Sequence, residues 1–353
     1  MLFGTRQIID YDVYYGKYEF LNQMIDLWNV FCNDSIELAL EDLSFHSSVK
    51  PLIKAMEVGL KRSISDKVKY VDSDVETYGF NSGKQIVVAF SGGKDSLATA
   101  IKYKSLGYDC KLFNLHGINK GFPGELNAAR NLADKLDLSL FVEEVKLKGK
   151  KFYVEHPLKN QIICTFALVY CLENNIDPHI VFGDFKTDTY QKSHYGLDWS
   201  DCFEVWEAYE QFMRTWVKDF KVDISFDVID DSYEVMSNNP EYIEDYQSCL
   251  MTIKYRNSLN KHNIDKYKVV DMLPNRCGSC WKCAMEYIYY ADKGVQKYNR
   301  DYYKHCLNVL KDKFTSAKAE LPKPKCMRDI YEGYFCTMKY YTDSVYYKDT
   351  KEK

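Results

Sequence analysis

Between residues 85 and 183, short apolar runs rich in β-branched residues alternate with longer segments in which apolar residues recur every three or four positions. The short runs predict buried strands, and the longer segments predict amphipathic helices. The expected strands are residues 86–90, 111–115, 138–145 and 179–182, and the expected helices are residues 96–105, 125–136 and 161–173. This alternation predicts an α/β fold, a parallel sheet covered by helices on both faces. Ligands bind such sheets at the carboxyl ends of the strands.

The chain on either side of this region has a different pattern. Apolar residues at helical spacing between residues 18 and 64, among them Phe20 and Trp28, predict N-terminal helices, with residues 33–35 capping a second helix at 36–43. After Asp184 the alternation weakens, and the Tyr- and Lys-rich tail from residue 287 is again helical in pattern. Four regions are therefore expected: an N-terminal helical region 1–82, an α/β domain 83–245, a cysteine-containing lobe 246–290 and a C-terminal helical extension 291–353.

The sequence S-G-G-K-D-S at residues 91–96 lies directly between the first strand and the first helix of the α/β domain. Gly92 and Gly93 can take backbone angles that turn N–H groups toward an anion, and the helix that follows contributes the positive end of its dipole. The hydroxyl groups of Ser91 and Ser96 are further donors. Asp95 would repel a phosphate, so it is expected to bind the magnesium that accompanies ATP. Lys94 belongs to the same loop, with its side chain read as solvated.

This loop resembles the PP-loop of N-type ATP pyrophosphatases, which split ATP between the α and β phosphates and transfer AMP to a substrate. Within that superfamily the chain most resembles a diverged 7-cyano-7-deazaguanine synthase of queuosine biosynthesis. The similarity continues in L-H-G at 115–117, E-L-N-A-A at 125–129, K-N at 159–160, V-F-G at 181–183 and W-S-D-C at 199–202. It implies catalytic roles for Ser91, Asp95 and Ser96. It also implies that the whole loop, with Gly117, Asn160 and Gly183, binds the nucleotide.

Three cysteines, Cys277, Cys280 and Cys283, form a C-x2-C-x2-C run, and Cys249 is the nearest cysteine upstream. Four thiolates at such spacing can close a tetrahedral, structural zinc site. The alternatives are buried apolar cysteines or an iron–sulfur cluster, which some PP-loop tRNA thiolases carry. The resemblance argues for zinc, because the synthase family has one cysteine followed by this run. The long gap after Cys249 leaves other candidates for the fourth ligand: Cys306, Cys326 and Cys336.

The amino-acid composition restricts where in the cell the protein is expected and which partners it is expected to bind. The chain of 353 residues has 47 basic and 51 acidic side chains, so its net charge of -4 offers no general attraction to nucleic acid. No apolar run approaches the roughly 20 residues of a membrane span, and the amino terminus has no signal sequence, so a cytoplasmic protein is expected. The 30 tyrosines and 19 phenylalanines fit core and subunit packing, which is compatible with a homodimer.

The resemblance implies a HUP-like doubly wound sheet with helical extensions and a small zinc-binding lobe that holds its metal through four cysteines. It also implies an ATP-, Mg2+- and Zn2+-dependent ligase that adenylates a carboxylate, 7-carboxy-7-deazaguanine, and couples it to ammonia. Phe203 and Lys159 stand where the family has arginines, which leaves two alternatives open. These are a PP-loop enzyme that adenylates another carboxylate, on a protein or a modified base, and a tRNA-thiolating PP-loop enzyme. Minor site candidates, some beside an expected lid at 187–200, are His116, Asp184, Asp188, His194, Asp201 and Cys202.

Overall fold

The computed structural model describes residues 6–10, 14, 16–32, 40, 43–60, 63–79, 83–118, 124–150, 158–185, 203–227, 229–247 and 281–320. The chain forms two compact units, Met1–Ser232 and Tyr233–Lys353. The first unit contains the main sheet and the S-G-G-K-D-S loop.

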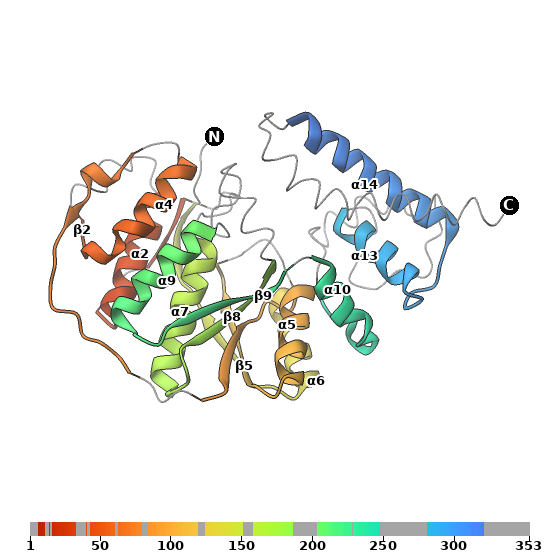
Figure 1. Ribbon diagram of the computed structural model, residues 1–353, viewed down its shortest axis with the longest axis horizontal. Helices are drawn as coiled ribbons and strands as arrows, with labels where there is room; N and C mark the ends of the chain where they lie inside the picture. Colours follow the sequence, from red (N-terminus) through yellow and green to blue (C-terminus); the bar gives the residue numbers. More distant parts are fainter. Residues whose placement is uncertain are drawn as a thin grey trace. The chain divides into compact units, whose positions relative to one another are not determined.

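The main sheet has five strands, all parallel, in the order β6-β5-β4-β8-β9 (Figure 1). The chain runs outward from β4 to β5 and β6, then returns to the other side of β4 for β8 and β9. The strand order therefore reverses at β4, and open α/β sheets bind their ligands at the carboxyl edge of such a reversal. The strands are β4 (Gln85–Ala89), β5 (Asp109–His116), β6 (Leu140–Glu144), β8 (His179–Phe185) and β9 (Lys221–Phe226).

Helices cover both faces of this sheet, as the sequence predicts. Right-handed connections put α5 and α6 on one face and α7 and α9 on the other (Figure 1). Val87 of β4 joins the main core beneath α7, whereas its neighbour Val88 is equally buried on the opposite face. Because both faces exclude water at the centre of the sheet, the central strand β4 is apolar at residues 86–89. The helices are α5 (Lys94–Ser105), α6 (Glu125–Leu136), α7 (Lys159–Asn174) and α9 (Phe203–Trp216).

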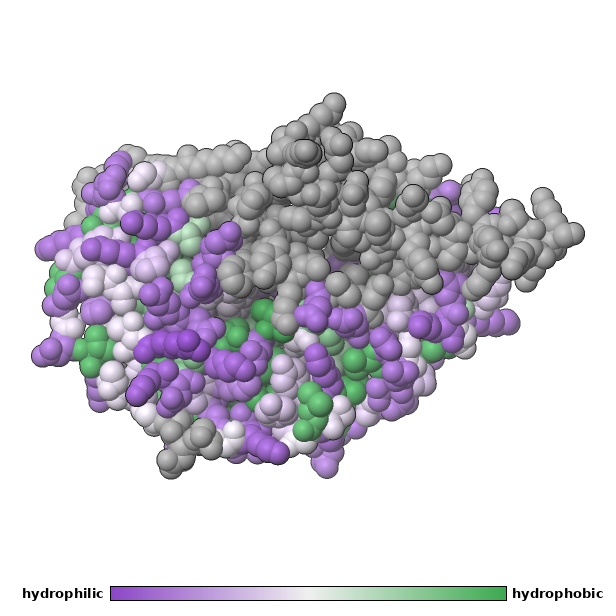
Figure 2. Space-filling model, viewed as in Figure 1, coloured by the Kyte–Doolittle hydropathy of each residue, from purple (hydrophilic) through white to green (hydrophobic). Residues whose placement is uncertain are grey.

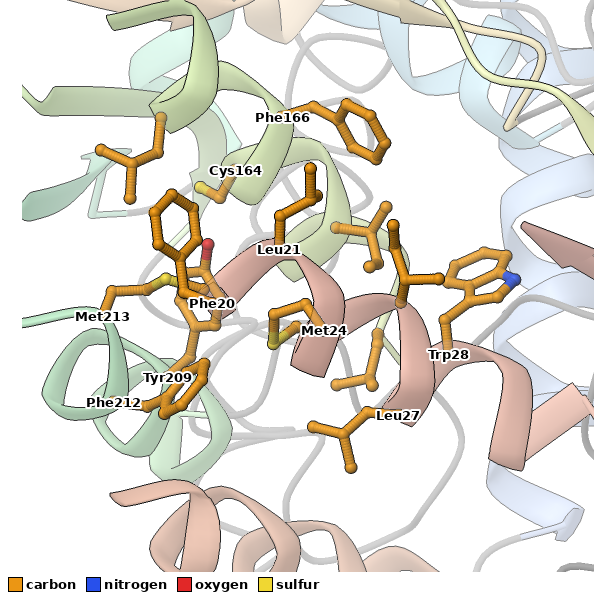
Figure 3. Packing of buried hydrophobic residues seen from close by; sticks show 14 of the residues in the cluster. Phe20, Leu21, Met24, Leu27, Trp28, Cys164, Phe166, Tyr209, Phe212 and Met213 are labelled. Carbon is orange, nitrogen blue, oxygen red and sulfur yellow. The ribbon is translucent and has the colours of Figure 1, made fainter. Parts of the chain in front are cut away.

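The N-terminal helices α2 (Glu19–Cys32) and α4 (Lys50–Leu60) form a further layer, in which α2 packs against α7 and α4 packs against α9. In Figure 3, Leu21 and Met24 of α2 lie among side chains of α7 and α9, including Cys164 and Phe212. Each large apolar side chain buried in this way contributes roughly 1.5–3 kcal/mol. The predicted N-terminal helices are confirmed here, while the second helix expected at 36–43 falls almost entirely outside the described residues.

Several elements of the first unit were not predicted, among them β9 and α9. The edge strand β9 alternates polar residues such as Asp223 with apolar ones such as Ile224, so it lacks the continuous apolar run of the other strands. Helix α9 lies in the region after Asp184 where the alternation weakens. Smaller elements are the antiparallel pair β1 (Arg6–Ile9) and β7 (Leu147–Lys150), the parallel pair β2 (Ser44–Phe45) and β3 (Lys69–Tyr70), and the 3-10 helices η1 (Ser47–Val49) and η2 (Ser65–Lys67).

The second unit is helical over its described residues, in agreement with the pattern of the tail. Helix α13 packs against α14. Beneath them the phenol group of Tyr246 donates a hydrogen bond to the buried carboxylate of Glu286, and the Tyr246 and Tyr290 hydroxyl oxygens lie 2.9 Å apart. The elements are η4 (Pro240–Tyr242), α13 (Trp281–Asp292) and α14 (Arg300–Glu320), and the boundary between the units falls within α10 (Ile229–Ser237).

The described surface is mixed in character. On the face shown in Figure 2, hydrophobic residues of the described ranges are scattered among hydrophilic ones. The large apolar side chains that are exposed come from separate elements and include Leu106, Val71 and Tyr298. Isolated apolar residues of this kind are normal on protein surfaces. Within the described ranges every helix is too short or too polar to cross a lipid bilayer.

One buried carboxyl group makes the stability of the first unit depend on pH. Asp26 of α2 is 8% exposed, and its Oδ1 has no hydrogen-bond partner in the described part of the chain. Burial raises the pKa of Asp26 to about 7. The folded state therefore binds this proton more tightly than the unfolded state, so the stabilising effect of the proton is lost as pH rises from about 4 to about 7.

We expect Asp26→Asn to raise the free energy of unfolding by about 2 to 4 kcal/mol near pH 8 and to change it little near pH 4, because the neutral amide resembles the protonated acid. Urea unfolding at both pH values measures this. The control is Asp223→Asn. Burial opposes ionisation there, but hydrogen bonds from His179 and Lys221 prevail and lower the pKa of Asp223 to about 2. Its replacement should therefore destabilise the protein near pH 7. Equal destabilisation by Asp26→Asn at both pH values would contradict the prediction.

Candidate functional site

The loop at residues 91–96 leaves the sheet at its point of strand reversal and enters α5 without an intervening turn. The N–H group of Phe90 donates to the carbonyl oxygen of Phe113 at 2.7 Å, and the side-chain amide of Asn114 donates to the carbonyl oxygen of Phe90 at 2.7 Å. These bonds from β5 hold the chain up to the first loop residue. Helix α5 then begins at Lys94 instead of Ser96, because Gly93 is its N-cap.

Only glycine fits at position 92, because of its backbone conformation and its close approach to α6. Its φ is +78°, in the left-handed region, and a Cβ atom there would lie 2.5 Å from the backbone nitrogen of Ala129 in α6. The loop therefore passes directly over the first turns of α6, with no room for a side chain. Gly93 has φ −82° and ψ 167°, an extended conformation that any residue adopts. The special backbone angles expected at both glycines are thus required at Gly92 alone.

The two serines of the loop converge around Gly93. Their hydroxyl oxygens lie 3.3 Å apart, the N–H group of Gly93 donates to Ser91 Oγ at 3.3 Å, and Ser96 Oγ donates to the carbonyl oxygen of Gly93 at 3.1 Å. Both hydroxyls therefore lie at the N-terminus of α5, where unpaired N–H groups and the helix dipole favour an anion. The sequence predicts catalytic roles for both serines, and the structure brings them together.

The side chain of Lys94 is not solvated, contrary to its sequence interpretation. It is only 5% exposed, forms an ion pair with Asp95 and donates a hydrogen bond to Ser232. Ser232 lies on α10, and its hydroxyl group donates to Asp95 Oδ1 at 2.9 Å. A buried ammonium group needs such partners, because an unpaired buried charge is costly. Asp95 itself stays 32% exposed. Sequence analysis missed Ser232, since no motif surrounds it.

The end of β8 fixes the backbone beneath Asp95. A Cβ atom on Gly183 would lie 2.6 Å from the carbonyl carbon of Asp95, so the strand end packs directly on the first turn of α5. Thr99 donates to the carbonyl oxygen of Asp95 at 2.8 Å, and Ser225 of β9 donates to that of Phe182 at 2.8 Å. The predicted site residue Gly183 is therefore adjacent to the loop, and its lack of a side chain allows that contact.

Other predicted site residues lie on neighbouring elements. Gly117 makes the turn after β5 with φ +92°, and a Cβ atom there would lie 2.9 Å from the carbonyl oxygen of Val145. Asn160 lies in the first turn of α7. Glu125 opens α6, where burial raises the pKa of its carboxyl group to about 7 although the charge of Lys159 lowers it.

Much of the predicted metal and lid chemistry lies outside the described residues. Asp188, His194, Asp201, Cys202, Cys249, Cys277 and Cys280 are in this group. Cys283 is described and lies buried on α13, at 3% exposed. Within the described ranges no group of three or more His, Cys, Asp or Glu side chains could hold a metal ion. The zinc site therefore stays a prediction. His116 is exposed at the end of β5, and Asp184 is partly buried near the end of β8.

The described loop fits ATP with magnesium. Gly92 and Gly183 let the loop pack closely on the backbone of α6 and β8, and the hydroxyls of Ser91 and Ser96 are donors suited to phosphate oxygens. Asp95 is the partly exposed carboxylate at the same helix terminus and is of the ligand type that Mg2+ prefers beside nucleotide phosphates. Hydroxyl and N–H donors at a helix N-terminus, placed at the carboxyl edge of a parallel sheet, are chemically suited to bind phosphate.

No protein-family model matches the sequence, and no curated protein matches it. Among solved structures the chain is similar to an NMN synthetase from Francisella tularensis, at 10% identity and a TM-score of 0.30, covering 79% of this chain and 97% of that chain. It is also similar to an NH3-dependent NAD synthetase from Campylobacter jejuni subsp. jejuni NCTC 11168, in complex with the nitrate ion, at 12% identity and a TM-score of 0.27, covering 78% and 97%. Similarity this weak decides neither fold nor activity, so the loop and the strand order carry the argument.

Proposed function

We propose that this chain is an ATP-dependent ligase of the PP-loop type, which transfers AMP to a carboxylate, releases pyrophosphate and passes the acyl group to ammonia. The observation that carries the proposal is the S-G-G-K-D-S loop. It leaves β4 where the strand order reverses, turns through the positive φ of Gly92, and brings two serine hydroxyls to the N-terminus of α5. This combination suits a highly charged leaving group such as pyrophosphate better than it suits a plain structural turn.

In the proposed reaction a carboxylate oxygen attacks the α-phosphorus of ATP, and the bond from that phosphorus to the bridging oxygen breaks, so that pyrophosphate leaves. Ser91, Ser96 and the first N–H groups of α5 donate hydrogen bonds to the leaving group as its negative charge grows. Asp95 would hold Mg2+, which when bound supplies positive charge beside the phosphates. Ammonia then attacks the acyl carbon, AMP leaves with the bonding electron pair, and the nitrogen loses a proton.

For the carboxylate we propose 7-carboxy-7-deazaguanine, which a second round of adenylation would carry through the amide to 7-cyano-7-deazaguanine. The family-like positions beyond the loop support this choice, and of these Gly183 packs against the backbone of Asp95. Lys159 favours the alternative of a different carboxylate. It carries a single point charge at the start of α7 and cannot form the two parallel hydrogen bonds of an arginine.

A product assay tests the proposal. Purified protein with ATP, magnesium, ammonia and 7-carboxy-7-deazaguanine is expected to release AMP and pyrophosphate, and to release neither without the carboxylate. Other carboxylates assayed in parallel would reveal a different acceptor. AMP and pyrophosphate at background with every carboxylate would contradict adenylation, and ADP with phosphate would show cleavage at another bond of ATP.

We also propose a structural zinc site, and elemental analysis of the same sample should find about one zinc ion per chain. Cys280→Ser is expected to lower the zinc content to near zero, because a closed thiolate site loses most of its affinity with one ligand. Cys110→Ala, a buried cysteine of β5, is the matched control and should keep the metal. A brown sample containing iron would instead indicate a cluster, and a metal-free wild type would contradict the site.

A further inference from the structure

We propose that Lys94 and Ser232 orient the carboxylate of Asp95 so that Oδ1 is kept from the metal and Oδ2 alone is presented to it. The inference rests on the proposed function, in which Asp95 holds magnesium. The Lys94 ammonium group contacts Oδ1 and donates to Ser232 Oγ, and the Ser232 hydroxyl donates to the same Oδ1 at 2.9 Å. Lys94 Nζ, Ser232 Oγ and Asp95 Oδ1 thus form a closed triangle in which each atom contacts the other two.

The two oxygens of Asp95 have different surroundings. Lys94 is 5% exposed and Ser232 is fully buried, whereas the Asp95 side chain is 32% exposed. Within the described ranges the hydrogen bonds and the ion pair of this carboxylate are made by Oδ1, so Oδ2 is the oxygen that remains available to a metal. The backbone of Asp95 is held by Thr99 and by the close approach of Gly183. Neither the main chain nor the side chain can therefore turn without breaking buried contacts.

The charges explain why Oδ1 should stay with Lys94 when a metal arrives. A buried ammonium group that lost its carboxylate would be left without a counter-charge, and that costs several kcal/mol. The same ammonium group repels a divalent cation at Oδ2. Metal binding by the protein alone should therefore be weak and should become strong only with the phosphates of ATP, which is the usual way that Mg2+ is held in nucleotide sites. In this arrangement Ser232 is a positioning residue, and Lys94 makes metal binding depend on the nucleotide.

The first test removes the hydroxyl group. Ser232→Ala is expected to raise the Mg2+ concentration for half-maximal pyrophosphate release about fivefold or more, with kcat at saturating Mg2+ within about threefold of wild type. Ser237→Ala is the matched control, because this serine lies on the same helix and its buried Oγ has no hydrogen-bond partner in the described part of the chain. A purely structural role for Ser232 would lower stability without moving the Mg2+ dependence.

The second test removes the buried charge and needs no turnover. Mn2+ binding is followed by electron paramagnetic resonance, with and without a non-hydrolysable ATP analogue. Lys94→Met keeps much of the side-chain volume and is expected to tighten Mn2+ binding to the nucleotide-free protein about fivefold or more, since it removes a repelling charge. Ser232→Ala should weaken Mn2+ binding in the presence of the analogue, and Ser237→Ala should leave it unchanged.

The two readouts separate the inference from the proposed function. If neither wild type nor any variant releases pyrophosphate but the Mn2+ affinities change in the expected directions, the proposed adenylation is wrong and the positioning of Asp95 stands. If wild type releases pyrophosphate but Ser232→Ala matches Ser237→Ala in both assays, the positioning role is wrong. Weaker Mn2+ binding by nucleotide-free Lys94→Met would also overturn it, because the ammonium group would then be aiding the metal.

Discussion

Replacement of Asp95 by asparagine is expected to reduce pyrophosphate release about 100-fold or more, the usual cost of losing one group that stabilises charge at the reacting centre. The amide oxygen can still accept the hydrogen bonds from Ser232 and Lys94, although the variant should be less stable because the buried Lys94 ammonium group loses its counter-charge. The amide cannot bind magnesium as a carboxylate does. Initial rates at saturating ATP and Mg2+ measure the loss, with circular dichroism confirming that the variant is folded.

The matched control is Asp109→Asn, the same chemical change at the start of β5. The Asp109 side chain is 50% exposed and bonded to Lys111 and Gln85 at the opposite end of the strand from the loop edge. Its replacement is expected to alter the rate less than about twofold, since exposed ion pairs contribute little. Should Asp95→Asn keep more than about a tenth of wild-type activity, Asp95 would not be the metal ligand.

Gly92→Ala is expected to abolish detectable nucleotide binding and to destabilise the first unit by about 2 to 4 kcal/mol. The added methyl group would lie 2.5 Å from the backbone nitrogen of Ala129, and backbone atoms of α6 cannot move aside as a flexible side chain would. The loop would have to lift away from α6, which would separate the hydroxyls of Ser91 and Ser96. Calorimetric titration with a non-hydrolysable ATP analogue and thermal unfolding measure the two effects.

Gly107→Ala separates backbone strain from steric contact. Gly107 has φ +82°, close to the value at Gly92, but an added Cβ would meet nothing within 4 Å. This control is expected to cost about 1 kcal/mol and to leave nucleotide binding unchanged. If the two alanine variants bind the nucleotide equally well, the close approach of the loop to α6 is not what shapes the site.

The strands and helices that the sequence predicts correctly are those with a regular pattern of apolar residues. Strands at the centre of the sheet contain apolar runs, residues 86–89 in β4 and 180–182 in β8, and these runs stand out against the polar residues that flank them. The predicted helix 125–136 matches α6 residue for residue, because its apolar face is regular and Gly124 precedes it. Edge strand β9 was missed because the polar residues Lys221, Asp223 and Ser225 alternate with its apolar ones, which makes its pattern no stronger than that of a loop.

The site itself was only partly predictable. Local sequence was enough to place Ser91, Gly92 and Ser96 at a strand-to-helix junction, since the motif and its flanking elements are contiguous. It could not reveal Ser232, which contacts Asp95 across 137 residues of sequence. Lys94 was misread because most lysines are solvated, and only the coordinates show the partners that make its burial tolerable.

The layer formed by α2 and α4 limits how far the chain can be shortened from its N-terminus without exposing apolar core residues. A shortened chain beginning at residue 83 would keep the S-G-G-K-D-S loop but expose the outer sides of α7 and α9 to water. Phe166, Phe212 and Met213, all buried in the intact chain, would be uncovered together. Apolar patches of that kind promote self-association. Fragments made for crystallisation or activity screening should therefore retain both N-terminal helices.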